Sequence, residues 1–358
     1  MNKSLVAQAV LLAFSAAALA QGSLVDQSTQ FTENTTITID QVSGEQTNRY
    51  AGLVSTTGDM TVTITDGAVL TIEGNQADIE DLERLYGAFT QSGSTLTVTG
   101  DTVMNLIAST KEVRAIRTYG DMTFNGSTTV VANGGSGTVV GVEVWEGATL
   151  TFSGSSTHIT ATSEGGRIIG VQNHTSDGAV INFDADETVI EVENDIGSTN
   201  YTQGVLAYRS TTNFTGNTTV TVKGGAEDTY GIDVQTDPGV EPETSVNFYG
   251  DQTTIDVSGL YYTYAVRPSG ATGSINFYGQ SVTLKADSTY GQATALNAQY
   301  GATAYFAGNV DMTVTGKTAY GILNTTYGGS STQQFGTVQI DGNATIKATG
   351  ESAYGIAN

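Results

Sequence analysis

The stretch from Tyr230 to Gly259, YGIDVQTDPGVEPETSVNFYGDQTTIDVSG, decides the fold of this chain. It contains three short runs, YGIDV, SVNFYG and TTIDVSG, in which apolar and polar residues alternate and which Gly or turn-forming residues close. Alternation at period two in Val, Ile, Thr and aromatic residues is typical of β-strands. A unit of three such strands that recurs about every 30 residues predicts one coil of a β-solenoid.

The middle run recurs in the form aliphatic-x-Phe-x-Gly, at steps of 26 to 34 residues. Its first residues are Leu70, Leu96, Met122, Leu150, Ile181, Thr212, Val246, Ile275, Ala304 and Val338. Its central residue is Phe in seven consecutive units, namely Phe124, Phe152, Phe183, Phe214, Phe248, Phe277 and Phe306. In the end units this place is taken by Ile72, Val98 and Ile340. Because successive side chains of a strand point to opposite faces, we expect one inward-pointing ladder.

The first run places a small residue before an aliphatic one. The pairs are Gly52-Leu53, Gly87-Ala88, Ala115-Ile116, Gly141-Val142, Gly170-Val171, Gly204-Val205, Gly231-Ile232, Ala265-Val266, Ala295-Leu296, Gly321-Ile322 and Gly355-Ile356. The first residue of each pair is always Gly or Ala, which predicts a crowded position where a larger side chain would clash. The aliphatic residue that follows it predicts a second core ladder. The next residue varies freely, which predicts a solvent-exposed face; it is Phe89, Arg117, Glu143, Gln172, Leu206, Asp233, Arg267 or Asn297.

These patterns predict an all-β protein, a right-handed parallel β-helix of about ten three-stranded coils over residues 67–358. Residues 21–66 contain weaker strands, such as Thr35–Asp40 and Met60–Thr65, and are expected to cap the N-terminal end. The segment NQADIEDLERL, Asn75–Leu85, is expected to form a helix-like insertion that replaces the third strand of its coil.

The two ends of the chain carry further signals. Lys3, the apolar run from Leu5 to Phe14 and the small residues Ala18-Leu19-Ala20 predict a secretory signal peptide over residues 1–20, too short to span a membrane. The last residues, AYGIAN, begin a coil whose other strands do not follow, so the natural protein is expected to continue.

Composition limits the partners. The chain has 13 Lys and Arg against 36 Asp and Glu, a formal net charge of −23, and no Cys. Nucleic acids and anionic membrane surfaces require basic patches, so neither is an expected partner. An exported protein without Cys must be stabilised by its core alone, which stacked coils provide.

Signals for catalysis are weak. The two histidines are His158 and His174, and the segment NHTSD places His174 beside Ser176 and Asp177. Members of a catalytic triad must converge from separate segments, so these neighbours predict an exposed turn. No enzymatic activity and no cofactor are expected.

One acidic cluster and one aromatic group are the candidate sites. The acidic cluster is a weak calcium candidate because its oxygens alternate along a strand, although such faces are usually only solvated; it comprises Asp184, Asp186, Glu187, Glu191 and Glu193. The aromatic group follows the inward Phe residues or lies on the next connection; it comprises Tyr249, Tyr278, Tyr261, Tyr262, Tyr264 and Arg267. Outward aromatic side chains on a rigid scaffold predict a contact site for sugars or proteins, unless neighbouring loops cover them.

The signal peptide, the Cys-free repeats rich in Thr, Gly and Asn, the Tyr-Gly-Ile corners and the aliphatic-x-Phe-x-Gly strands resemble autotransporter passenger domains of the pertactin-like or adhesin type. The resemblance covers about residues 50–358. It implies a β-helix displayed on a Gram-negative bacterium, or secreted from it, with an outer-membrane barrel downstream. The Gly-Asp-Ser-Gly motif of the family's serine proteases is missing, so protease activity is not implied.

The resemblance implies adhesion or aggregation, with host or bacterial surface glycans or proteins as partners. Two alternatives remain open from the sequence. The first is a secreted polysaccharide-active β-helix, a lyase or glycoside hydrolase, which requires a fixed cluster of acids and bases on one face. The second is a structural stalk without a ligand.

Overall fold

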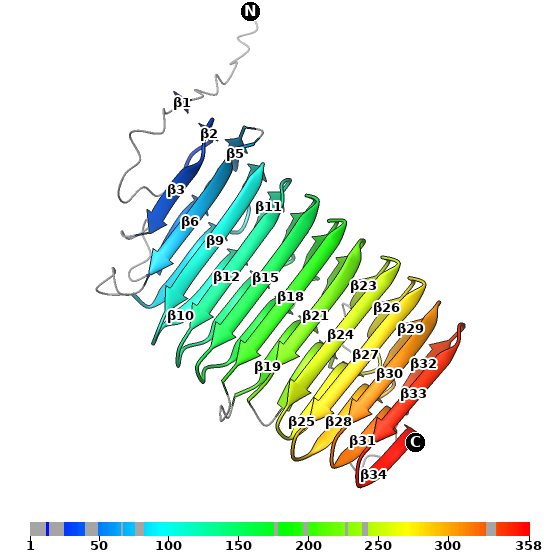
Figure 1. Ribbon diagram of the computed structural model, residues 1–358. Coiled ribbons are helices and arrows are strands. Elements are labelled where there is room, and N and C mark those ends of the chain that lie inside the picture. The colour runs from blue at the N-terminus through cyan, green and yellow to red at the C-terminus, as the bar shows by residue number, and fades with distance from the viewer. Residues whose placement is uncertain are drawn as a thin grey trace, which may run out of the picture.

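The protein is an all-β solenoid of about ten turns in the computed structural model, with three parallel sheets stacked along one axis (Figure 1). The structure describes residues 12–13, 25–39, 49–65, 67–75, 82–174, 178–195, 200–225, 228–237, 243–326 and 334–358, and these contain no helix. Each coil contributes one strand to sheet B, then one to sheet A, then one to sheet C. The fold class predicted from the repeat is therefore confirmed.

The strands of the three sheets have the following bounds. Sheet A contains β1 (Leu12–Ala13), β2 (Thr29–Phe31), β5 (Asp59–Ile64), β8 (Thr95–Thr99), β11 (Asp121–Phe124), β14 (Thr149–Phe152), β17 (Val180–Phe183), β20 (Thr211–Phe214), β23 (Thr244–Phe248), β26 (Gly273–Phe277), β29 (Thr303–Phe306) and β32 (Thr337–Ile340). Sheet B contains β4 (Arg49–Ser55), β7 (Arg84–Thr90), β10 (Glu112–Thr118), β13 (Val139–Val144), β16 (Ile168–His174), β19 (Thr202–Tyr208), β22 (Asp228–Gln235), β25 (Tyr262–Ser269), β28 (Gln292–Gln299), β31 (Thr318–Thr325) and β34 (Ser352–Ala357). Sheet C contains β3 (Thr35–Ile39), β6 (Val69–Asn75), β9 (Asp101–Ala108), β12 (Thr128–Gly134), β15 (Ser156–Ser163), β18 (Glu187–Asn194), β21 (Asn217–Lys223), β24 (Gln252–Gly259), β27 (Ser281–Ser288), β30 (Asn309–Thr315) and β33 (Ala344–Thr349).

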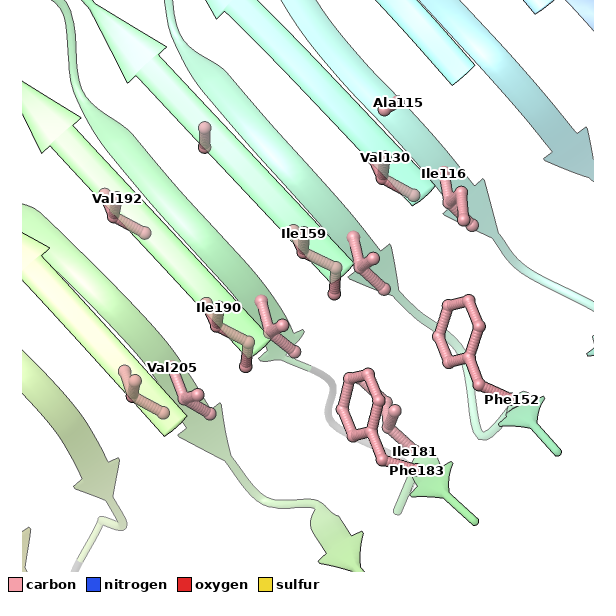
Figure 2. Packing of buried hydrophobic residues seen from close by; sticks show 14 of the residues in the cluster. Ala115, Ile116, Val130, Phe152, Ile159, Ile181, Phe183, Ile190, Val192 and Val205 are labelled. Carbon is pink, nitrogen blue, oxygen red and sulfur yellow. The ribbon is translucent and has the colours of Figure 1, made fainter. Parts of the chain in front are cut away.

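The Phe ladder lies inside the solenoid, as the alternation predicts. Equivalent residues of successive coils are direct partners, for example Phe152 and Phe183, and all seven rings are at most 1% exposed. Neighbouring ring centroids are 4.7 to 5.4 Å apart and the planes differ by 2° to 11°. Figure 2 shows two of these rings, Phe152 and Phe183, in the same buried cluster as Ile159 and Ile190 of sheet C. The spacing of the rings follows the spacing of parallel strands, about 4.8 Å, so one continuous core runs through the coils.

The small residue of each sheet B strand is crowded, as expected. A Cβ on Gly141 would lie 2.6 Å from the carbonyl oxygen of Gly170 and 2.6 Å from a methyl of Ile159. The aliphatic residues that follow the small residue are buried from Leu53 to Ile322, whereas Ile356 in the terminal strand is 69% exposed.

The ladder assignment at the N-terminal end was wrong. Leu70 and Ile72 lie in β6 of sheet C, and the sheet A partner of Leu96 is Met60 of β5. In these end units an aliphatic residue stands where Phe marks the middle strand elsewhere, so the second and third strands look alike in the sequence. Sheet A therefore extends into the residues expected to form a cap.

The expected helix is also wrong at its ends. Asn75 closes β6 and residues 84–85 begin β7, while residues 76–81 lie outside the described residues. The third strand of this coil is present as β6. The carboxylates of this segment suggested a solvated helix face, but pairing with neighbouring coils decides the conformation of its two ends.

Most of the expected signal peptide lies outside the described residues. Leu12 and Ala13 alone are described, as the short strand β1 beside β2. No helix in the described part of the chain is long and apolar enough to cross a bilayer.

Candidate binding face of sheet B

The outer face of sheet B differs from the exposed face that the sequence predicts. The residue two places after the small residue is buried in most coils rather than exposed: Arg117 is 8% exposed, and Glu143 and Asp233 are 0% exposed, while Arg267 and Leu323 are partly buried. The small residue and the aliphatic residue both face inward, so the outward side chains on either side of them pack over the same surface and bury each other. The expectation of a freely solvated face was therefore wrong.

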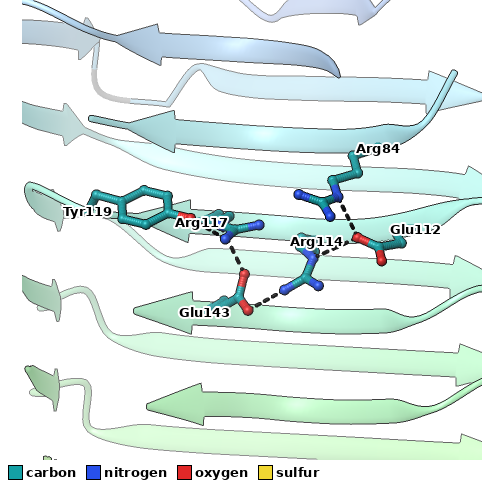
Figure 3. Close-up of polar contacts among 6 residues, drawn as sticks. All are labelled: Arg84, Glu112, Arg114, Arg117, Tyr119 and Glu143. Carbon is teal, nitrogen blue, oxygen red and sulfur yellow. Dashed lines mark hydrogen bonds and ion pairs between the residues drawn. The ribbon is translucent and has the colours of Figure 1, made fainter. Parts of the chain in front are cut away.

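The first polar cluster of this face links β7, β10 and β13 (Figure 3). Arg84 Nε and Arg114 Nε lie 2.6 Å and 3.2 Å from Glu112 Oε2. Arg114 also pairs with Glu143, whose other oxygen lies 3.1 Å from Arg117 Nε. Burial alone would lower the pKa of Arg114, but Glu143 and Glu112 outweigh it and raise that pKa. These residues are the first charge network.

The second polar cluster links β19, β22 and β25. Arg267 donates two hydrogen bonds to Asp233, of 3.0 Å and 2.9 Å, in the bidentate geometry that arginine and carboxylate favour. Gln203 Nε2 donates to the same carboxylate at 2.9 Å. The Arg267 guanidinium also lies 4.0 Å from the ring centroid of Tyr230 and donates to its hydroxyl. Burial raises the pKa of Tyr264 to about 12, and it raises the pKa of Tyr230 as well. We name the hydrogen-bonded residues the second charge network; they are Gln203, Tyr230, Asp233 and Arg267.

An aromatic row runs beside the first network and past it. Each neighbouring pair of rings has centroids 4.7 to 6.4 Å apart and planes inclined by 18° to 66°. We name this the outer aromatic row; it consists of Tyr86, Phe89, Tyr119, Trp145, His174 and Tyr208.

Several polar atoms of the outer aromatic row are buried without a partner. Tyr86 Oη, Trp145 Nε1 and His174 Nδ1 have no hydrogen-bond partner among the described residues. Burial lowers the pKa of His174. Sequence analysis expected an exposed turn at this histidine. Instead, His174 ends β16 and its ring packs between Trp145 and Tyr208; Ser176 and Asp177 of the same segment lie outside the described residues.

The arginines of the chain gather at sheet B. All seven lie within its strands or one residue from them: Arg49, Arg84, Arg114, Arg117, Arg167, Arg209 and Arg267. Lys223, Lys285 and Lys347 lie in strands of sheet C. The net charge of the chain is −23, so the gathering of all seven arginines at sheet B distinguishes this sheet from sheets A and C.

The aromatic residues singled out in the sequence fall into two groups. Tyr249 and Tyr278, 49% and 46% exposed, stack at a centroid distance of 5.0 Å on the corner between sheets A and C. A strand of eight residues, about 26 Å long, separates this corner from the next one, where Tyr261 and Tyr262 are 48% and 49% exposed. Tyr264 stacks on a ring of the second charge network at 5.3 Å, and Arg267 belongs to that network. The structure therefore does not bring the six residues together as one patch.

The acidic residues proposed for calcium are also divided. Asp184 and Asp186 are exposed at the corner before β18, whereas Glu191 and Glu193 lie on that strand. Glu191 Oε2 lies 3.1 Å from His158 Nε2, and Glu193 Oε2 lies 3.7 Å from Lys223 Nζ. The described residues hold no group of three or more side chains placed to bind a metal ion.

Two features escaped the sequence reasoning. Four members of the outer aromatic row stand four residues after the small residue of successive units, and this spacing could have identified them; they are Tyr119, Trp145, His174 and Tyr208. The second is an amide ladder on sheet A, with hydrogen bonds of 2.9, 3.0 and 2.9 Å between successive side chains; it comprises Asn182, Asn213, Asn247 and Asn276. Its signal is an Asn before Phe in four successive units.

Comparisons of the chain with protein-family models, with curated proteins and with solved structures gave no significant match. Function is therefore inferred from the geometry of the described residues.

Proposed function

We propose that the protein is an exported passenger of the autotransporter type that adheres to cell surfaces by binding glycans on the outer face of sheet B. The signal-peptide pattern of residues 1–20 supports export. A rod of stacked coils supports display, because repeat proteins present extended surfaces suited to binding.

The observation that carries the proposal is the joint occurrence of the outer aromatic row and two charge networks on one face. Sugars offer apolar C–H faces and many hydroxyl groups, so their binding sites combine aromatic rings with fixed polar groups. On sheet B the arginine, glutamine and carboxylate side chains are held in place by each other before any ligand arrives. Such preorganisation reduces the ordering cost of binding.

The same geometry favours contact over cleavage. A general acid or base must reach the reacting oxygen of its substrate. Glu143 and Asp233 are fully buried. Glu143 already forms ion pairs with arginines of the neighbouring strand, and Asp233 already accepts two hydrogen bonds from Arg267. These carboxylates fix the arginines instead of facing a substrate.

The proposal is tested by screening the full chain against arrayed glycans while assaying each bound glycan for cleavage. We expect binding without cleavage. Replacing Trp145 and His174 together by Ala should weaken that binding at least about tenfold. The matched control replaces Tyr249 and Tyr278 by Ala on the corner between sheets A and C and should bind like wild type. Cleavage products would instead support the polysaccharide-active enzyme, and equal binding by both double variants would remove sheet B as the site.

A further inference from the structure

Five of the six arginines whose side chains are described are already neutralised. Arg84, Arg114 and Arg117 pair with carboxylates of the first charge network, and Arg267 pairs with Asp233. Arg209 Nη2 lies 2.9 Å from Asp237 Oδ2.

Arg167 is the exception among them. It immediately precedes β16 and is exposed, and no hydrogen bond or ion pair joins its side chain to another described residue; its backbone carbonyl accepts a hydrogen bond from Val139. It lies between the two networks, because in sheet B β16 stands between β13 of the first network and β19 of the second. Although Arg167 is exposed to solvent, the protein atoms packed around it and then the positive charge of Arg114 lower its pKa, and Glu143 and Asp233 offset this only in part. Its guanidinium is therefore not paired with a carboxylate among the described residues.

An apolar cluster lies beside Arg167 on the outer face. Ile169, the next outward residue, on β16, pairs in register with Val140 and clusters with Leu206, and all three are buried. A ligand group at Arg167 therefore approaches from solvent, with this apolar cluster on one side, and a charge-assisted hydrogen bond gains strength where apolar groups exclude water.

We propose that Arg167 binds the carboxylate of an acidic sugar within the glycan held on sheet B. A guanidinium offers two parallel N–H donors that match a carboxylate, and it stays charged at every physiological pH. The charges around it restrict the ligand further. The carboxylates of both networks and the net charge of −23 repel a dense polyanion, so the fitting glycan carries isolated acidic residues among neutral ones.

A peptide ligand fits this face less well. Strand addition requires a free sheet edge, but every strand from β7 to β31 in sheet B is paired on both sides. Arg167 immediately precedes β16, which lies in the middle of this run. Recognition there must use side chains alone.

The inference rests on the proposed function and is tested with the single tryptophan, since Trp145 lies on the same face and its fluorescence reports binding there. The full chain is titrated with sialyllactose and with lactose, and with trigalacturonate and its methyl ester. Wild type should prefer an acidic probe over its neutral counterpart at least about tenfold, as expected for one charged hydrogen-bonded pair. Arg167→Gln should abolish this preference, Arg167→Lys should keep part of it, and Lys347→Ala on sheet C should keep all of it.

The possible failures are distinguishable. Equal affinity of wild type for acidic and neutral probes, or an unchanged preference in Arg167→Gln, overturns the role of Arg167 and leaves glycan binding by sheet B intact. Absence of binding by every probe overturns the acidic-sugar proposal, and the glycan array then decides separately whether sheet B binds neutral glycans. Unchanged thermal unfolding of Arg167→Gln shows that the loss is not a folding defect.

Discussion

The inner Phe ladder and the outer aromatic row obey the same strand spacing but differ in order. The inner rings are nearly parallel, with planes within 11° of each other, whereas the outer rings are inclined by 18° to 66°. Inside, close packing on all sides fixes each ring plane. Outside, only the neighbouring coils constrain the rings, and some polar atoms such as Trp145 Nε1 remain without partners among the described residues.

The difference also lies in composition. One side chain repeats seven times inside, because each coil offers the same cavity to its central residue. Outside, Tyr, Phe, Trp and His alternate and are interrupted by ion pairs, so each coil presents a different surface. The inner ladder therefore serves stability, and in our account the outer row serves recognition.

The largest effect is expected from the inner ladder. Phe248→Ala removes a ring that is 1% exposed and stacked on both sides, and it should cost about 3–5 kcal/mol of local stability. Tyr249→Ala, one residue further and half exposed, should cost less than about 0.5 kcal/mol. Urea unfolding of both variants measures this, and equal losses would break the distinction between inside and outside.

The buried charge of the outer face should come second. Glu143→Gln leaves Arg114 and Arg117 without their shared counter-charge and should cost about 3 kcal/mol. The control, Glu191→Gln, breaks an exposed pair with His158 and should cost about 0–1 kcal/mol. If thermal unfolding shows the two variants to be equally stable, the first charge network does not order the face of sheet B.

The amide ladder of sheet A gives a smaller effect. Asn247 accepts one hydrogen bond from Asn276 and donates one to Asn213, so Asn247→Ala should cost about 1–2 kcal/mol. Thr151→Ala, at the equivalent place of a coil outside this ladder, is the control and should cost less. Chemical unfolding of the pair measures the difference, and a larger loss for Thr151→Ala would contradict a stabilising ladder.

The smallest effect concerns pH. Because burial lowers the pKa of His174 in the folded protein below its ordinary value of 6.5, the unfolded chain binds more protons, and stability should fall as the pH drops through 6.5 towards the folded pKa. The half-buried ring is partly screened by solvent, so the loss should be about 0.5 kcal/mol or less. His174→Gln should remove this part of the pH dependence. A pH profile that is identical in the variant would show that the packed ring does not resist protonation.

The repeat could be predicted from the sequence because the core enforces it. Phe at seven successive central positions and Gly or Ala at the crowded positions make the repeat visible in the sequence, and the structure confirms both ladders over most of the chain. The repeat is less distinct at the N-terminal end, where Phe is missing from the central position. Met60 and Leu70 therefore fit the middle strand equally well in the sequence, and the structure places Met60 there.

The candidate face could not be predicted in the same way. Free variation at the position of Arg117, Glu143 and Asp233 indicated solvent, although complementary pairs such as arginine and carboxylate on successive coils produce the same variation. Burial there depends on neighbours about 30 residues away, which only the coil register identifies. Trp145 and His174 both stand four residues after the small residue of their unit. They were overlooked because the residue type at this position changes from coil to coil, unlike the Phe and Gly or Ala positions of the repeat.

The most direct test of the central claim is hydroxyl-radical footprinting of the full chain with and without the tightest glycan found on the array. We predict that the glycan protects Trp145, His174 and Tyr208 on the outer face of sheet B and leaves Tyr249 and Tyr278 unchanged. Protection of Tyr249 and Tyr278 without protection of the outer aromatic row would place the ligand on the corner between sheets A and C and contradict the account.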